Sequence, residues 1–233
     1  MANKKENGAL DVNETLSKSE AFFLKYKKAI IISVVVLVVV IAGAFAYNSY
    51  VAVPRAEKAS TALSQGQEYF DMEQYDKALN GDSTGYVGFV KIASDYSGTD
   101  AANLANLYAG LCYANLGKWE EAVKFLDSYS PSGDAMVSPA AVGALGNAYA
   151  QTGNVDKAIS TLKKAASMAD SKALDGVNVS VSPTFLLQAG VLLESQNKKA
   201  EALELYKDIK KKYVNSHLVQ SGEIEKYIAR VSE

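Results

Sequence analysis

The chain has 233 residues, 48% of them hydrophobic, and carries 24 basic and 26 acidic side chains for a formal net charge of −2. This length and apolar content suit one ordinary domain with an appendage. A single Cys excludes an intramolecular disulfide, and with a single His it leaves no material for a zinc site or a histidine-based catalytic pair. The charge provides no basic face for DNA or RNA. We therefore expect no enzyme, cofactor, metal or small-molecule substrate.

Residues 1–28 are predicted to form a cytoplasmic tail. Residues 1–20 are rich in Asn, Glu, Lys and Ser, which predicts disorder. In the stretch 19–28, three aromatic side chains alternate with three lysines, a pattern typical of a helix that enters a membrane from its surface. A plain flank that stops membrane transfer is the alternative.

Residues 29–50 are predicted to form a transmembrane helix. The run from Ile30 to Tyr47 contains no charged residue, and at 1.5 Å per residue it spans about 27 Å, close to the hydrocarbon thickness of a bilayer. Three lysines precede the run and few basic residues follow it. The positive-inside rule then leaves the N-terminus in the cytoplasm and residues 51–233 outside it. In a bacterium, this domain would lie in the periplasm, attached to the inner membrane.

A cleaved signal peptide is the competing interpretation of this segment. Ala44-Phe45-Ala46 satisfies the small-x-small requirement for cleavage after Ala46. Almost thirty residues precede the apolar run, however, and the run is longer than the usual apolar region of about 7 to 15 residues. No Cys directly follows the span, so a lipoprotein anchor is excluded. We therefore favour a retained span, with the long helix 55–73 continuing from it and at most a kink at Pro54.

A broken unit is expected first in the soluble part. Gln65 to Ala78 have a helical pattern that the Gly- and Asp-rich segment 80–85 interrupts, so a new helix is expected within 85–98. Thr99 or Asp100 would cap the next helix.

Two stretches, 107–126 and 143–162, then repeat one pattern. Each matched position is offset by 36 residues (146 − 110 = 36): Gly110, Tyr113, Gly117, Trp119, Ala122 and Leu126 correspond to Gly146, Tyr149, Gly153, Val155, Ala158 and Leu162. Small residues let two antiparallel helices approach closely, and Gly117 and Gly153 stand where one helix must stop in the αL conformation.

A third unit follows, with Gly190 lying 44 residues after Gly146 (190 − 146 = 44). The added residues, 173–182, are predicted to form an extended loop; their alternating valines leave a strand that pairs with a partner as the alternative. Ser138 and Ser182 each precede a Pro and are predicted to be N-caps. A short amphipathic helix over 224–231 would close the stack.

This spacing resembles the tetratricopeptide repeat, a helix-turn-helix unit of about 34 residues. The fold class is therefore predicted to be all-α: a single N-terminal transmembrane helix followed by a solenoid of about four antiparallel units and a capping helix over 51–233. Such solenoids are scaffolds that bind proteins, and the fold does not specify the partner.

The arrangement of tail, span and repeats also resembles the bacterial YfgM-type family, and the segments 78–82, 94–113 and 206–213 resemble membrane-bound repeat proteins. The resemblance implies an ancillary subunit of the SecYEG translocon that helps to hand secreted proteins to a PpiD-type chaperone. The alternative is an adaptor for envelope assembly or cell division that is not tied to the translocon.

In such a solenoid the first helix of each unit lines the inner surface. Residues that lie away from the glycine seam are then free to contact an extended peptide. The residues predicted for this groove are Leu107, Leu111, Asn115, Asn147, Gln151, Leu187, Val191 and Glu194. No pair of basic residues lines the groove, so capture of a C-terminal carboxylate is not expected. The lysines over 198–212 alternate with acids and are predicted to form a solvated face, with contact to anionic headgroups as the alternative.

Overall fold

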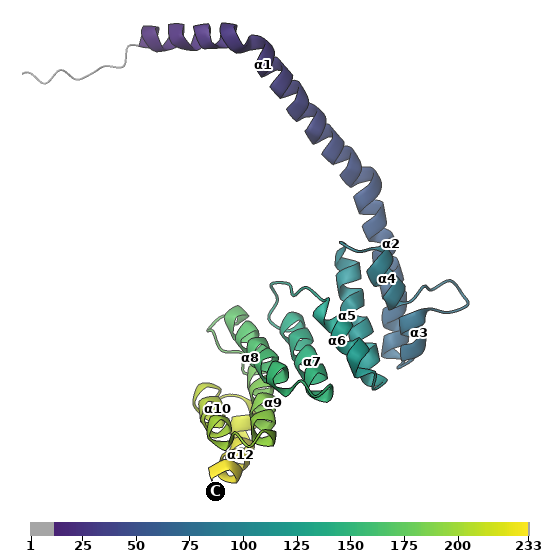
Figure 1. The fold of residues 1–233 in the computed structure, drawn as a ribbon, viewed down its shortest axis with the longest axis vertical. Helices are drawn as coiled ribbons and strands as arrows, with labels where there is room; N and C mark the ends of the chain where they lie inside the picture. The colour runs from purple at the N-terminus through teal and green to yellow at the C-terminus, as the bar shows by residue number, and fades with distance from the viewer. Residues whose placement is uncertain (1–11, 233) are drawn as a thin grey trace, which may run out of the picture. The chain divides into compact units, whose positions relative to one another are not determined.

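The computed structural model describes residues 12–232, with side chains from Glu20 onward. Within that part, every regular element is helical (Figure 1), which confirms the all-α class. The chain divides into two compact units, one ending at Pro54 and the other beginning at Arg55.

The first unit consists of α1 (Val12–Tyr47) and the five-residue π-helix η1 (Asn48–Ala52), and α2 (Val53–Asp71) follows without a break. Disorder was predicted for residues 1–20. Residues 1–11 lie outside the described residues, and residues 12–20 belong to α1, so the prediction of disorder is wrong for residues 12–20. The kink expected at Pro54 is a π turn instead, in which the Val53 N–H donates to the Asn48 carbonyl. Proline has no N–H and its ring crowds the carbonyl four residues earlier, so a wider turn relieves the conflict.

The second unit is a stack of antiparallel helix pairs. From the second helix of the first pair through both helices of the fourth, each helix packs against the next one along the chain, and the C-terminal helix packs against the last of them. The helices that follow α2 are α3 (Tyr75–Asn80), α4 (Phe89–Asp95), α5 (Asp100–Asn115), α6 (Trp119–Asp127), α7 (Val137–Gln151), α8 (Val155–Lys172), α9 (Ser182–Ser195), α10 (Lys199–Lys212), α11 (His217–Gln220) and α12 (Glu223–Ser232).

The backbone shows four repeat units through one shared turn. The residue between the paired helices has a positive φ each time: 57° at Glu73, 70° at Gly117, 78° at Gly153 and 60° at Asn197. These turns are spaced by 44, 36 and 44 residues (117 − 73, 153 − 117, 197 − 153). Only two of them are glycines, so the sequence pattern alone identified only those two.

Each intact pair is held by a glycine on the first helix that faces a large residue on the second. A β-carbon on Gly110 would collide with Leu126, and the same holds for Gly146 with Leu162 and for Gly190 with Tyr206. The partner is always 16 residues later in the chain (126 − 110, 162 − 146, 206 − 190). The glycine seam therefore sets how closely the two helices of a unit approach.

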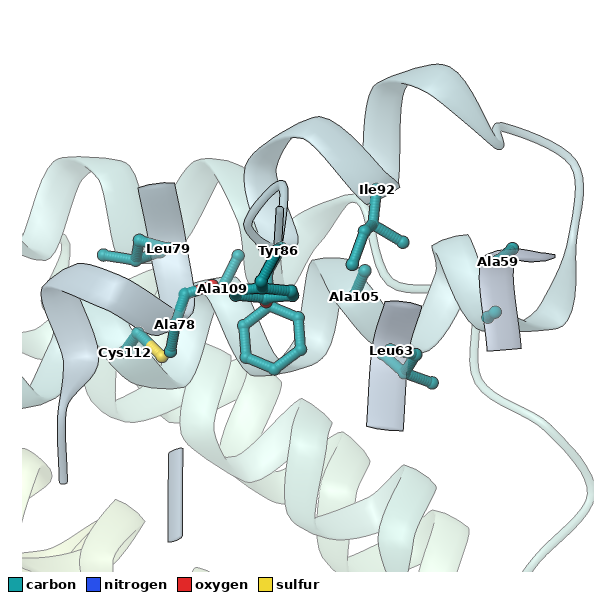
Figure 2. Close-up of a cluster of buried hydrophobic side chains, with 11 residues drawn as sticks. Ala59, Leu63, Ala78, Leu79, Tyr86, Ile92, Ala105, Ala109 and Cys112 are labelled. Carbon is teal, nitrogen blue, oxygen red and sulfur yellow. Dashed lines mark hydrogen bonds between the residues drawn. The ribbon is translucent and has the colours of Figure 1, made fainter. Parts of the chain in front are cut away.

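The first unit lacks this partner because its second helix, α3, ends after six residues. The space beside Gly66 is filled by Tyr86 and Phe89, which come from the following loop and from α4. Tyr86 is held there by a hydrogen bond of 2.8 Å from its hydroxyl to the Ala78 carbonyl, and its backbone N–H donates to the Asp82 carboxylate at 3.1 Å. Figure 2 shows Tyr86 within the buried cluster of this unit. The new helix expected within 85–98 starts at Phe89.

Of the predicted N-caps, one is confirmed and two are wrong. Thr99 caps α5 as expected, accepting from the Ala102 N–H at 3.1 Å. Ser138 and Ser182 are not N-caps; both are fully buried in the first turn of their helices. The capping acceptors stand four residues earlier.

Those acceptors are Asp134 and Asn178, one before each first helix. Asp134 Oδ1 accepts from the Val137 N–H at 2.6 Å, and Asn178 Oδ1 accepts from the Val181 N–H at 3.1 Å. They are 44 residues apart (178 − 134), the spacing of their two units. Residues 173–181 form a loop of turns without a strand, which confirms the predicted loop but not its extended conformation, and Ser182 already begins α9.

The C-terminal helix closes the stack as predicted. Ile224 and Val231 of α12 are buried in the last cluster. Arg230 also binds Glu194 of α9 through two hydrogen bonds, of 2.8 Å from Nε and 2.7 Å from Nη2.

Candidate interaction surface

A mostly exposed stripe of small and amide side chains lies on α7 and again on α9; of its eight residues six are exposed, and Ala144 and Gln188 are partly buried. The spacing of i, i+4, i+7 and i+11 brings four residues of each helix onto one face. Their positions on the two helices differ by 44 residues. We name this stripe the first-helix face: Ala140, Ala144, Asn147 and Gln151 of α7, with Thr184, Gln188, Val191 and Ser195 of α9.

The structure brings three of the predicted groove residues together on this face. Asn147 and Gln151 are exposed on α7, and Val191 is 41% exposed on α9. The residues two turns earlier on each helix, Ala140 and Thr184, were not predicted. The same 44-residue offset, applied seven residues back, identifies them.

The predicted residue Glu194 does not belong to the face. The 44-residue offset from Gln151 leads to Ser195, which is exposed, whereas Glu194 lies one position away with its side chain 17% exposed. Its carboxylate accepts hydrogen bonds from Arg230 and from the Tyr206 hydroxyl, the latter at 2.5 Å. Burial raises the pKa of Glu194, but these hydrogen bonds outweigh it and the pKa is lowered. Glu194 is a structural anchor for α12.

The remaining predicted positions lie against the core or stand apart. Leu107 is 6% exposed within a buried cluster, and Leu187 is half-buried. Leu111, on α5 like Leu107, packs against the cluster that contains Leu107. Asn115 is exposed at the end of α5, where its side-chain N–H donates to the Leu111 carbonyl at 2.9 Å.

The α5 counterpart of the face is partly covered. Leu104 and Tyr108 correspond to Ala140 and Ala144, and both pack against the first cluster. The Tyr108 ring stacks on Phe89 at a centroid distance of 5.2 Å, and its hydroxyl accepts from Gln67 at 2.9 Å. The broken first unit thus covers α5, and the open face begins at α7.

The chemistry of the open face is neutral. Its eight residues include three amides or hydroxyl-bearing side chains on α9 and two amides on α7, and none of them is ionisable. Amide and hydroxyl groups both donate and accept hydrogen bonds, which suits the backbone of an extended peptide. Small alanines beside them leave room for a chain to lie close to α7.

Groups with catalytic potential stand elsewhere in the described residues. Cys112 is fully buried, and burial raises the pKa of its thiol to about 12, so it remains protonated. His217 is exposed. Within residues 20–232, no group of three or more potential metal ligands is present.

Comparisons with known families agree with this architecture. Residues 20–178 match the model of a tetratricopeptide repeat-like domain. Residues 144–213 match a tetratricopeptide repeat. No curated protein matches the chain.

Proposed function

Since the chain belongs to the tetratricopeptide repeat-like domain family, we propose that it is a membrane-anchored scaffold that binds proteins or extended peptides on the first-helix face. The observation that carries the proposal is the stripe of amide, hydroxyl and small residues, six of the eight exposed, that repeats between α7 and α9 at the unit spacing. A repeated neutral face can follow the repeating backbone of an extended chain, because both offer hydrogen-bonding groups at regular intervals.

The anchor is proposed from α1. From Val34 to Ile41, its side chains are 53–64% exposed, so this apolar stretch is not covered within its own unit. Such a surface is unfavourable in water and favourable in hydrocarbon. The continuous helix over Glu20–Asp71 is long and apolar enough to cross a membrane. We assign the span to residues 29–50.

The orientation and compartment extend the same proposal. Lys25, Lys27 and Lys28 precede the apolar stretch, which favours a cytoplasmic N-terminus and a periplasmic repeat domain. The resemblance to YfgM-type proteins supports a place beside SecYEG, where the face would receive emerging chains and pass them to a PpiD-type chaperone. The alternative role is an adaptor for envelope assembly, and the identity of the partners distinguishes the two roles.

The binding face is tested by site-specific photocrosslinking in membranes. A photoreactive residue is introduced at Asn147 or Gln151, with Lys164 on α8 as the matched exposed control outside the face. We expect adducts at Asn147 and Gln151 that are absent at Lys164. Equal adducts at all three positions, or none at Asn147 and Gln151, would refute binding on this face.

The adducts also identify the partner. Sec components or a periplasmic chaperone would support the translocon role, whereas envelope-assembly proteins alone would replace it with the alternative.

Topology is tested by protease treatment of spheroplasts. We expect added protease to degrade the repeat domain and to leave a membrane-bound fragment that contains residues 29–50. A repeat domain that resists protease in intact spheroplasts but not in lysed ones contradicts the orientation. A mature chain that begins after Ala46 indicates a cleaved signal peptide.

A further inference from the structure

A hollow surface lies between α8 and α10, with Leu186 of α9 in its floor, and none of the residues of the first-helix face lines it. This outer cleft has a volume of about 840 Å³. Its apolar part is lined by Ala166, Leu186 and Leu205, and the Tyr213 side chain closes one part of the wall. The volume falls within the range of about 300–1,000 Å³ that is common for ligand sites.

The cleft is larger than its counterpart one unit earlier. The counterpart between α6 and α8 has a volume of about 250 Å³. Its residues Val142, Thr161 and Lys164 correspond, at the 44-residue offset, to Leu186, Leu205 and Asp208 of the outer cleft. The difference follows from helix length, because α6 has 9 residues and α8 has 18. The extra turns of α8 carry Ser167, Asp170 and Ser171 along the cleft.

Some charged side chains that line the cleft form ion pairs and others do not. Asp170 is 7% exposed and is already bound by Lys212 at 2.5 Å. Lys163 on α8 and Lys211 on α10 are exposed, and neither forms an ion pair with any residue whose side chain the structure describes. Asp208 is the remaining acid in the lining. Two lysines on opposing helices therefore flank an apolar floor.

We propose that the outer cleft binds an acidic segment of a partner protein, with apolar side chains on Leu186 and Leu205 and carboxylates on Lys163 and Lys211. The positive charges of Lys163 and Lys211 favour acidic residues of the partner, and the apolar floor favours a partner side chain that inserts into the cleft. A flat anionic membrane fits less well, because the exposed acids Glu201 and Glu204 lie on α10 together with Lys211. This site is independent of the first-helix face.

The test uses the full chain in micelles of a neutral detergent. The probe is a fluorescein-labelled peptide with two leucines flanked on both sides by glutamates, and its matched counterpart carries lysines in their place. We expect fluorescence anisotropy to detect binding of the glutamate peptide only. The double variant Lys163→Glu with Lys211→Glu should bind it at least about tenfold more weakly, since two exposed ion pairs of about 0.7 kcal/mol each correspond to that factor.

Lys207→Glu is the matched control, because Lys207 is exposed on α10 but outside the cleft lining. It should change the affinity by less than about twofold, since exposed charges beyond direct contact are largely screened by salt. An equal loss in Lys207→Glu reveals bulk charge attraction and overturns the proposal. Failure of the unmodified chain to bind the glutamate peptide overturns it as well.

Two further arms separate the remaining sources of binding. The first arm measures binding of phosphatidylglycerol vesicles to the unmodified chain and to the double variant. If the double variant binds the vesicles more weakly but binds the glutamate peptide as well as the unmodified chain does, the cleft is a lipid surface and the proposal is overturned. The variant Gln151→Ala on the first-helix face should leave peptide binding unchanged. Failure of crosslinking at Asn147 therefore does not bear on this site, and failure of peptide binding does not bear on the first-helix face.

Discussion

The hydroxyl of Tyr213 donates a hydrogen bond of 2.7 Å to the carboxylate of Asp170, which lies 43 residues earlier in the chain. The same carboxylate accepts from Ser182 Oγ at 2.7 Å and from the Asn178 N–H at 2.9 Å. With Lys212 as a fourth donor, Asp170 connects the end of α8 to the following loop, the first turn of α9 and the end of α10. One buried acid thus joins the third and fourth units.

We predict that Asp170→Asn destabilises the repeat domain by about 1–3 kcal/mol, because it replaces an acceptor for four donors with an amide that cannot accept from all of them. Chemical denaturation of the full chain in detergent, followed by circular dichroism, measures the loss. Asp208→Asn is the matched control on exposed surface and should change stability by less than about 0.5 kcal/mol. Equal effects of the two variants would contradict the structural role of Asp170.

Acid should destabilise the fold through Asp170 and Glu194. Burial raises the pKa of each carboxyl, but hydrogen bonds from Lys212 and Tyr213 to Asp170, and from Arg230 to Glu194, outweigh it and lower both pKa values. The unfolded chain therefore binds more protons in acid, so this stability is present above about pH 4–5 and is lost as the pH falls through the folded-state values. Melting temperatures measured between pH 7 and pH 3 should fall on the acid side. In Asp170→Asn, the melting temperature should fall less between pH 7 and pH 3. If it falls as steeply as in the unmodified chain, Asp170 does not contribute to the acid sensitivity.

Gly190→Ala should destabilise the third intact pair by about 1–3 kcal/mol, because the added methyl meets the fully buried Tyr206 ring and forces the helices apart. Denaturant unfolding measures this cost. Ser195→Ala, on the exposed side of the same helix, is the comparison and should be close to neutral. A neutral Gly190→Ala would show that the α9–α10 spacing is not set by this contact.

Arg230→Ala should loosen the C-terminal cap by about 0.5–1 kcal/mol, a modest amount because the Arg230 side chain is 54% exposed. Hydrogen–deuterium exchange should accelerate in α12 while the rate in α5 stays unchanged, since exchange reports local opening. Lys226→Ala in the same helix serves as the control. Faster exchange across the whole stack would contradict a local effect.

Much of this fold could be predicted from the sequence because repeat packing depends on local patterns. The pairing of Gly110 with Leu126, and of Gly146 with Leu162, follows from one offset within contiguous stretches. The broken first unit follows from the two glycines, the Asn and the Asp over 80–85. That Tyr86 and Phe89 fill the space beside Gly66 could not be predicted, because it depends on a loop that folds back onto α2.

The candidate face was predicted less well. Asn147, Gln151 and Val191 follow from helical geometry and are exposed. The prediction of Glu194 misses the exposed position, Ser195, by one residue. A shift of one residue on a helix turns the side chain by 100°, and here the Glu194 side chain contacts Arg230 and Tyr206. The serine caps were wrong because Ser138 and Ser182 already lie in the first turn of their helices. Asp134 and Asn178 accept the N–H groups just before or at the helix start, and their distance of four residues hides them from a pattern of adjacent residues.

The contacts of α12 with α10, of α10 with α9 and of α9 with α8 have a mechanical consequence. Each pair rests on its neighbours, so tension on the C-terminus would meet the Arg230–Glu194 link first and the Asp170 junction next. A pulling experiment should therefore record a staircase of short extensions, one per pair, in place of a single rupture.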